Sequence, residues 1–180
     1  MLQIVIPGDE KWDEGNEQFV YTKDYTLSLE HSLISLSKWE SKWRKPFISK
    51  TAMSYEESID YIRCMTLTQN VPSDVYTRLT DKNMQEVSEY IEAPMTATWF
   101  ADDENKKKNN DIVTSEVIYY WMFSLNIPLE CQKWHLNRLL TLIRVCNEKN
   151  TPRKKKSKEE IMREQAAINK ARREKLKSKG

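Results

Sequence analysis

The stretch PLECQKWHLNRLLTLIRVCN, residues 128–147, determines how the rest of the chain packs. Placed on a helix at about 100° per residue, it gathers its apolar side chains on one side. That sector holds Leu136, Leu139, Leu140, Ile143 and Cys146, flanked by Leu129, Cys131 and Leu142, and the opposite sector holds Glu130, Lys133, Asn137, Thr141 and Arg144. So broad an apolar sector needs several neighbours, and Pro128 suits the first turn of a helix. We therefore predict one central packing helix over 128–147.

The segments before this stretch predict further helices. Residues 114–125 carry apolar side chains almost all round, so this helix is buried or contacts a partner, and it forms an antiparallel hairpin with the central helix. A helix from residue 29 or 32 to 45 ends at Pro46. Ser54 and Glu57 form a capping box for a helix over 55–66, and Thr80 caps one over 81–92.

The N-terminal segment predicts β-structure. The apolar run 2–6 ends at Pro7-Gly8, and residues 18–29 alternate apolar and polar side chains, as in a strand with one buried face. We expect these two segments to pair as a short hairpin that lies on the helices. Residues 95–100 are expected to be extended, and residues 102–111, which contain no apolar side chain, an exposed loop. The predicted fold is mainly α, a compact helical domain with an N-terminal β-hairpin and a basic C-terminal helical extension.

Charge divides the chain unevenly. Residues 153–180 hold twelve Lys or Arg and four Glu, a net +8, whereas residues 1–152 hold 17 basic and 23 acidic groups, a net −6. We predict a globular domain over 1–147, a linker over 148–157 and a basic helical tail over 158–180. The basic groups singled out in and before the tail are Arg153, Lys154, Lys155, Lys156, Arg163, Lys170, Arg172, Arg173 and Lys175.

This basic segment has three interpretations. It contacts nucleic acid through phosphates, docks on an acidic protein surface, or is a solvated extension without a specific partner. No aromatic residue follows Asn147, which excludes base stacking by the tail.

Catalytic and metal chemistry find little support in the sequence. The chain has two histidines and three glycines, and it contains neither a nucleophile elbow nor a Gly-rich phosphate loop. Cys131 and His135 share a helix face in the predicted central helix, and Cys146 lies further along it, but no close pair supplies the remaining zinc ligands. We expect His135 to be a core histidine. The sequence predicts a protein that is not an enzyme and has no metal site and no cofactor.

Compartment and membrane signals are equally sparse. No apolar run approaches the ~20 residues of a membrane span, and residues 1–6 lack the pattern of a secretory signal. Three scattered cysteines form no disulfide framework. We expect a soluble protein of a reducing cytoplasm, without membrane contact.

Four phrases in the chain are similar to one known family. ECQKWHLNRLLTLIRVCN (130–147), followed by a Pro-containing linker and a basic segment ending in LKSKG, resembles tailed-phage (siphophage) tail assembly chaperones. LEHSLISLSKWESKW (29–43), APMTATWF (93–100) and VIYYWM (117–122) fit the same pattern. The resemblance spans nearly the whole chain.

The resemblance implies a non-enzymatic protein that binds the tape-measure protein, and possibly the tail-tube protein, in the host cytoplasm and leaves before the virion matures. Apolar helices of a tape measure aggregate unless covered, and an aromatic groove can hold them. The tryptophans expected to do so are Trp39, Trp43, Trp121 and Trp134, each of which could instead be core. Trp134 lies off the main apolar sector, so we expect Trp134→Ala to weaken partner binding more than folding.

Three alternatives stay open beside the chaperone. One is a virion structural protein near the head–tail junction whose basic tail contacts DNA or an acidic neighbour. Another is a small regulatory nucleic-acid binder, which the acidic body disfavours. Self-association is a further possibility.

Overall fold

The computed structural model describes residues 1–48, 53–98, 100, 112–150, 162–163 and 165–166. The chain divides into two units, Met1–Asn147 and Glu148–Gly180. In the second unit, residues 148–150, 162–163 and 165–166 are helical. The predicted loop 102–111 and most of the predicted tail helix, with all its singled-out basic groups except Arg163, lie outside the described residues.

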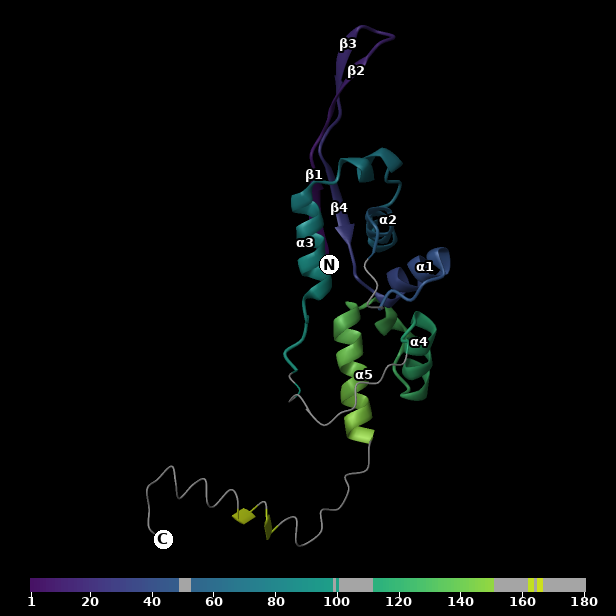
Figure 1. The fold of residues 1–180 in the computed structure, drawn as a ribbon, viewed down its shortest axis with the longest axis vertical. Coiled ribbons are helices and arrows are strands. Elements are labelled where there is room, and N and C mark those ends of the chain that lie inside the picture. Colours follow the sequence, from purple (N-terminus) through teal and green to yellow (C-terminus); the bar gives the residue numbers. More distant parts are fainter. Residues whose placement is uncertain (49–52, 99, 101–111, 151–161, 164, 167–180) are drawn as a thin grey trace, which may run out of the picture. The chain divides into compact units, whose positions relative to one another are not determined.

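The first unit is mainly helical, as predicted (Figure 1). Its helices are α1 (Leu33–Trp43), α2 (Tyr55–Met65), α3 (Asp81–Glu92), α4 (Ser115–Ser124) and α5 (Leu136–Asn150), with short 3-10 helices η1 (Ser73–Arg78) and η2 (Leu129–Lys133). The last three residues of α5 belong to the second unit. Its strands are β1 (Leu2–Ile6), β2 (Glu10–Asp13), β3 (Gln18–Tyr21) and β4 (Tyr25–Leu29). Residues 95–98, expected to be extended, have no regular secondary structure.

Local capping signals place the helix starts correctly. The Glu57 N–H donates to Ser54 Oγ at 3.2 Å, and the Ser54 N–H donates back to Glu57 Oε2 at 2.8 Å, which is the predicted capping box. Thr80 caps α3 in the same reciprocal way with Asn83. These helices begin where the sequence predicts because their starts depend only on residues three positions apart.

The prediction of one helix over 128–147 is wrong. Residues 129–133 form η2, the backbone of Trp134 is extended with φ −72° and ψ 162°, and α5 begins at Leu136. The tertiary contacts of residues 135 and 136 compete with a continuous helix: His135 bridges to Ser32, and the Leu136 N–H donates to the His31 carbonyl at 2.7 Å. α5 also continues to Asn150, three residues into the predicted linker, because no helix breaker precedes Pro152.

The N-terminal hairpin is confirmed and is longer than expected. β1 pairs with β4 and β2 with β3, both antiparallel, and the two residue numbers of every pair add up to 31. The two sheets therefore form one continuous ribbon, which leaves the helices at its β2–β3 end (Figure 1).

The ribbon corrects two details of the sequence interpretation. The predicted strand 18–29 is interrupted at residues 22–24, and a further strand, β2, lies between the two predicted ones. Pro7 has no N–H to donate to the ladder, which explains an interruption there. Side chains bridge the gap: the Gly8 N–H donates to Asp24 Oδ1 at 2.8 Å, and the Asp9 N–H donates to Thr22 Oγ1 at 2.6 Å.

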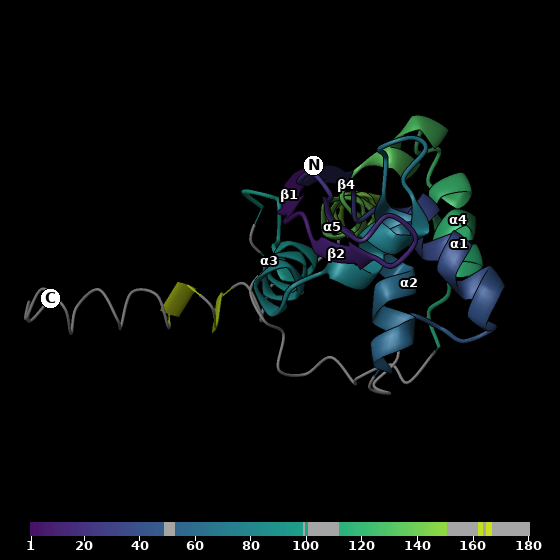
Figure 2. The ribbon, with the colours of Figure 1, turned by 90° about the horizontal axis from the view of Figure 1, so that it is seen from above.

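Two hydrophobic clusters form the core. The first lies among β1, β4, α1, α2, η1 and α3, and its buried members are Ile4, Ile6, Leu27, Leu29, Trp39, Tyr61, Ile62, Met65, Val75, Tyr76, Leu79, Val87 and Tyr90. The second lies among α1, α4, η2 and α5, and its buried members are Leu33, Leu36, Ile118, Met122, Ile127, Cys131, Leu136, Leu139 and Ile143. α1 belongs to both clusters, and Figure 2 shows it beside both α2 and α4.

The segment that enters α1 joins the two clusters. On one side, the Glu30 N–H donates to the Met65 carbonyl at 2.9 Å and the Leu67 N–H to the Ser28 carbonyl at 2.8 Å. On the other side, Ser32 bridges to His135. Residues 28–33, here called the hub, thus contact β1, the end of α2 and the start of α5.

Gly8→Ala tests the continuity of the ribbon. A Cβ at this position would lie 1.9 Å from the Thr22 carbonyl oxygen, a backbone atom that cannot move without separating the strands. We expect the variant to lose about 1–3 kcal/mol of unfolding free energy in urea denaturation, the usual cost of overpacking. Gly15→Ala is the control, because its nearest atom is the Asp13 side-chain oxygen at 3.3 Å. Equal losses in the two variants would contradict the continuous ribbon.

Candidate functional site

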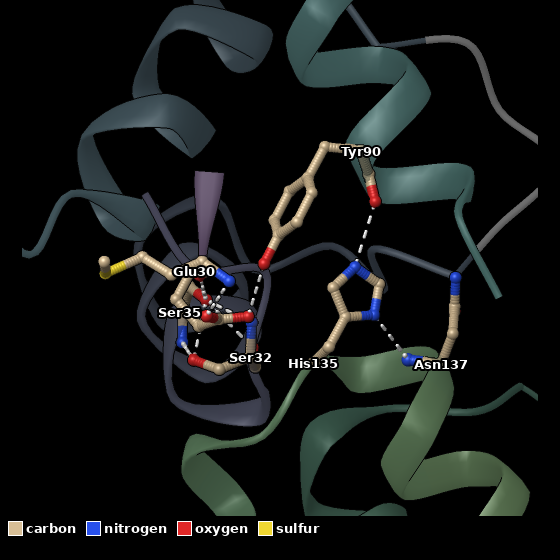
Figure 3. Close-up of polar contacts among 7 residues, drawn as sticks. Glu30, Ser32, Ser35, Tyr90, His135 and Asn137 are labelled. Carbon is tan, nitrogen blue, oxygen red and sulfur yellow. Dashed lines mark hydrogen bonds and ion pairs between the residues drawn. The ribbon is translucent and has the colours of Figure 1, made fainter. Parts of the chain in front are cut away.

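His135 links the end of α3 to the start of α5 (Figure 3). Its Nε2–H donates to the Tyr90 carbonyl oxygen at 2.9 Å, and its Nδ1 accepts the Asn137 N–H at 3.3 Å. Since a carbonyl only accepts and a backbone N–H only donates, these partners fix the neutral Nε2–H tautomer. The ring therefore caps α5 and leaves no nitrogen free for a metal.

The hub completes this polar junction. The Glu30 carboxylate accepts a hydrogen bond from the Tyr90 hydroxyl at 2.7 Å and lies 2.9 Å from the amino group of Met1. The Ser35 hydroxyl shares its hydrogen between the backbone carbonyls of Glu30 and Ser32, both at 2.9 Å (Figure 3). These bonds satisfy polar groups at the boundary of the two clusters, where an unpaired group costs about 1–3 kcal/mol.

His31 lies beside His135 in the same junction. The two ring centroids are 5.1 Å apart, and His31 Nδ1 lies 2.5 Å from the Tyr61 hydroxyl oxygen. Burial, and to a lesser extent His135, lowers the pKa of His31 to about 3. Burial also lowers the pKa of His135, which its bond to the Tyr90 carbonyl partly opposes. Both rings are therefore neutral at physiological pH.

The junction is closed to solvent. His31 is 2% exposed and His135 6%, so both imidazoles are shielded from water. The common helix face predicted for Cys131 and His135 does not form, because the chain changes from η2 to α5 between them. Among the residues that the structure describes, no group of three or more His, Cys, Asp and Glu side chains could hold a metal ion.

Because both histidines are buried, the unfolding free energy is expected to fall as the pH is lowered. In the unfolded chain each imidazole gains a proton near pH 6.5, whereas its folded pKa lies lower. The unfolded state therefore binds more protons as the pH falls through that value. We expect the unfolding free energy to fall by about 1 kcal/mol through His31 between about pH 7.5 and 5.5, with a further loss from His135, in a window above most carboxylate pKa values.

Urea denaturation across this window measures the effect, with His31→Asn as the comparison. The variant is expected to lose the part of the pH dependence that comes from His31, whatever its absolute stability. The same pH dependence in both proteins would contradict the neutral buried His31.

The candidate site is a groove formed by α1, α2 and η1. It has a volume of about 480 Å³, within the range of pockets that accept organic groups. Its lining residues are Lys42, Trp43, Tyr55, Glu56, Ile59, Asp60, Arg63, Tyr76 and Thr77. We call this surface the Trp43 groove. Three aromatic rings and Ile59 give it an apolar interior, and two cations and two carboxylates surround them.

Hydrogen bonds hold the walls of the Trp43 groove in place. Asp60 accepts Trp43 Nε1 at 2.9 Å and pairs with Lys42 across α1 and α2. On the η1 side, the Arg63 guanidinium lies 5.0 Å from the Tyr76 ring centroid, and the Tyr76 hydroxyl donates to Thr66 Oγ1 at 3.0 Å. Trp43 and Tyr76 are thus oriented before any ligand arrives, which lowers the entropic cost of binding.

The structure brings two of the four predicted tryptophans together. Trp39 and Trp43 stack with centroids 6.2 Å apart, because they lie four residues apart on one face of α1. Trp39 is 2% exposed, and its Nε1 donates to the Glu57 carbonyl at 2.9 Å, so it supports the groove from inside the core. Trp43 is half-buried and lines the groove. Only Trp43 of this pair offers a surface to a partner in this fold.

Trp121 and Trp134 lie in the other half of the unit. Both are half-buried and pack against the second cluster. The Arg138 guanidinium lies 4.3 Å from the Trp134 ring centroid, on the ring's face. Replacing Trp134 therefore removes core packing as well as surface, and its predicted role in binding stays a prediction.

The sequence interpretation missed most of the groove. Tyr55 was noted only as the start of a helix, and Arg63 and Tyr76 were not singled out. Tyr55 and Ile59 lie four residues apart on α2, and this spacing places them on one face. No local pattern joins them to Trp43 or Tyr76, because the groove arises from tertiary packing.

In the described parts of the chain, each helix is too short or too polar to cross a bilayer. Comparison of the chain with protein-family models, with curated proteins and with solved structures finds no match.

Proposed function

We propose that the protein is a non-enzymatic phage tail assembly chaperone that holds an apolar helix of the tape-measure protein in the Trp43 groove. The observation that carries this proposal is the open aromatic hollow between α1, α2 and η1. The sequence resemblance to tail assembly chaperones names the partner, and the groove supplies a physical means of binding it.

The chemistry of the groove suits an amphipathic helix. A helix presents side chains at i, i+3, i+4 and i+7, and a few of these fill an apolar hollow of this size. Lys42 and Arg63 balance Glu56 and Asp60 around the aromatic residues, so the lining has no net charge. A phosphate backbone would instead favour a basic surface. The groove thus favours a protein partner over a nucleic acid.

Transient binding also suits the scale of the site. A single hollow lined by nine residues is smaller than the ~20–30 residues a side of a standard protein interface. Small interfaces of this kind are typical of complexes that dissociate readily. A chaperone that leaves before the particle matures needs such an interface.

Two variants and one matched control test the groove. Tyr55 is 65% exposed, so Tyr55→Ala removes a groove wall with little cost in folding. Thr77→Arg places a long side chain in the hollow. We expect each to weaken binding of the tape-measure protein about tenfold, the scale of one interface anchor, and to reduce the soluble tape measure recovered on co-expression.

Tyr120→Ala is the control, because Tyr120 is 67% exposed on α4 and does not line the groove. It is expected to bind as the native chain does in calorimetric titration. Native affinity in both groove variants would overturn the proposed site.

The basic segment favours a second candidate, a virion structural protein near the head–tail junction. A net charge of +8 over residues 153–180, proposed here to form a basic helical extension, suits DNA or an acidic neighbour. Quantitative mass spectrometry of purified particles beside the infected-cell lysate separates the two. We expect the protein to be abundant in the lysate and absent from particles. Stoichiometric presence in particles would replace the chaperone with this structural role.

A further inference from the structure

The β2–β3 end of the ribbon carries an exposed aromatic face. Trp12 pairs with Phe19 and Glu10 with Tyr21 across the two strands. Directly opposed residues and their i+2 neighbours lie on the same side of a ribbon, so the three aromatic rings share one face. Trp12 is 52% exposed, Phe19 56% and Tyr21 72%. The Trp12 and Phe19 rings meet edge to face, with their centroids 4.9 Å apart.

The ribbon presents this face from an anchored base. Arg78 Nη1 of η1 donates to the Pro7 carbonyl at 3.0 Å and to Thr22 Oγ1 at 3.1 Å, and Asn83 Nδ2 of α3 donates to the Val5 carbonyl at 3.1 Å. At the far end, Asp13 accepts the Gly15 N–H at 2.9 Å and so orders the turn. Exposed aromatic residues on a braced element mark an interaction surface.

Charge identifies the kind of partner that fits. Residues 9–24 hold six acidic and two basic side chains, a net −4, whereas residues 153–180 of the same chain hold a net +8. Lys and Arg are attracted to carboxylates and also to the faces of aromatic rings. The ribbon end offers both kinds of acceptor.

We propose that the acidic aromatic end of the ribbon binds the basic segment 153–180 of a second copy of this chain, joining copies head to tail. This contact is separate from the Trp43 groove. Because it pairs two different surfaces, it leads to open chains or closed rings rather than to a two-fold dimer.

Every copy of the chain carries both the acidic ribbon end and the basic segment, so a second copy is a partner of complementary charge. Pairing between copies raises the mass of the particle in solution, whereas pairing within one chain leaves it at the monomer mass.

Charge reversal and its rescue test the pairing on the full chain. Glu14 and Glu17 are exposed in the turn between β2 and β3. We expect the native chain to exceed its monomer mass of 21.4 kDa in sedimentation at about 50 mM salt, and to return toward it at about 500 mM. Glu14→Lys with Glu17→Lys should weaken self-association about tenfold, as should Lys154→Glu with Lys155→Glu. Combining all four reversals in one chain should restore it.

Matched variants separate this contact from general charge effects. Glu92→Lys with Glu130→Lys makes the same charge change elsewhere on the unit, at two exposed positions, and is expected to leave self-association unchanged. Trp12→Thr with Phe19→Thr keeps strand-forming residues, removes two rings and should weaken association with an unchanged circular dichroism spectrum. A chain that stays monomeric at every concentration, or a four-reversal chain no stronger than either pair alone, would overturn the proposal.

Discussion

The backbone hydrogen bonds of the hub, residues 28–33, hold the two hydrophobic clusters of the first unit together. The hub pairs with β1 and with the end of α2 on one side and accepts the Leu136 N–H on the other. It then becomes α1, whose Trp39 enters the first cluster and whose Leu33 and Leu36 enter the second. Removing one large core side chain costs about 2–5 kcal/mol. Because α1 supplies such side chains to both clusters, a loss of α1 would destabilise both of them.

Both proposed contact surfaces depend on this arrangement. The Trp43 groove lies between the last turn of α1 and the outer face of α2, and Asp60 ties the two helices together through Lys42 and Trp43. The side chains of Ile4, Ile6, Leu27 and Leu29 anchor β1 and β4 in the first cluster. The same strand pairing continues beyond this cluster to the exposed β2–β3 end of the ribbon. One packed centre thus positions the two surfaces for which we propose different partners.

The sequence predicts the parts of this fold whose causes are local. The helix starts at Tyr55 and Asp81 follow from capping residues three positions apart, and the alternation in residues 18–29 predicts a half-buried strand, which holds for β4, residues 25–29, but not for the exposed β3. The break at His135 could not be predicted, because the bonds that favour it come from Tyr90 and His31, 45 and 104 positions earlier in the chain. The groove has the same origin: Trp43 is conspicuous in the sequence, but Tyr55 and Tyr76 join it only through tertiary packing.

Site-specific photo-crosslinking tests the central claim, that the Trp43 groove receives a helix of the tape-measure protein. A photoreactive phenylalanine analogue in place of Tyr55 places the reactive group on the groove wall, and the same analogue in place of Tyr120 reports a similarly exposed position outside the groove. In cells assembling the particle, we expect an adduct with an apolar helical segment of the tape-measure protein from position 55 and none from position 120. Adducts from position 120 alone, or adducts at position 55 only with other proteins, would contradict the account.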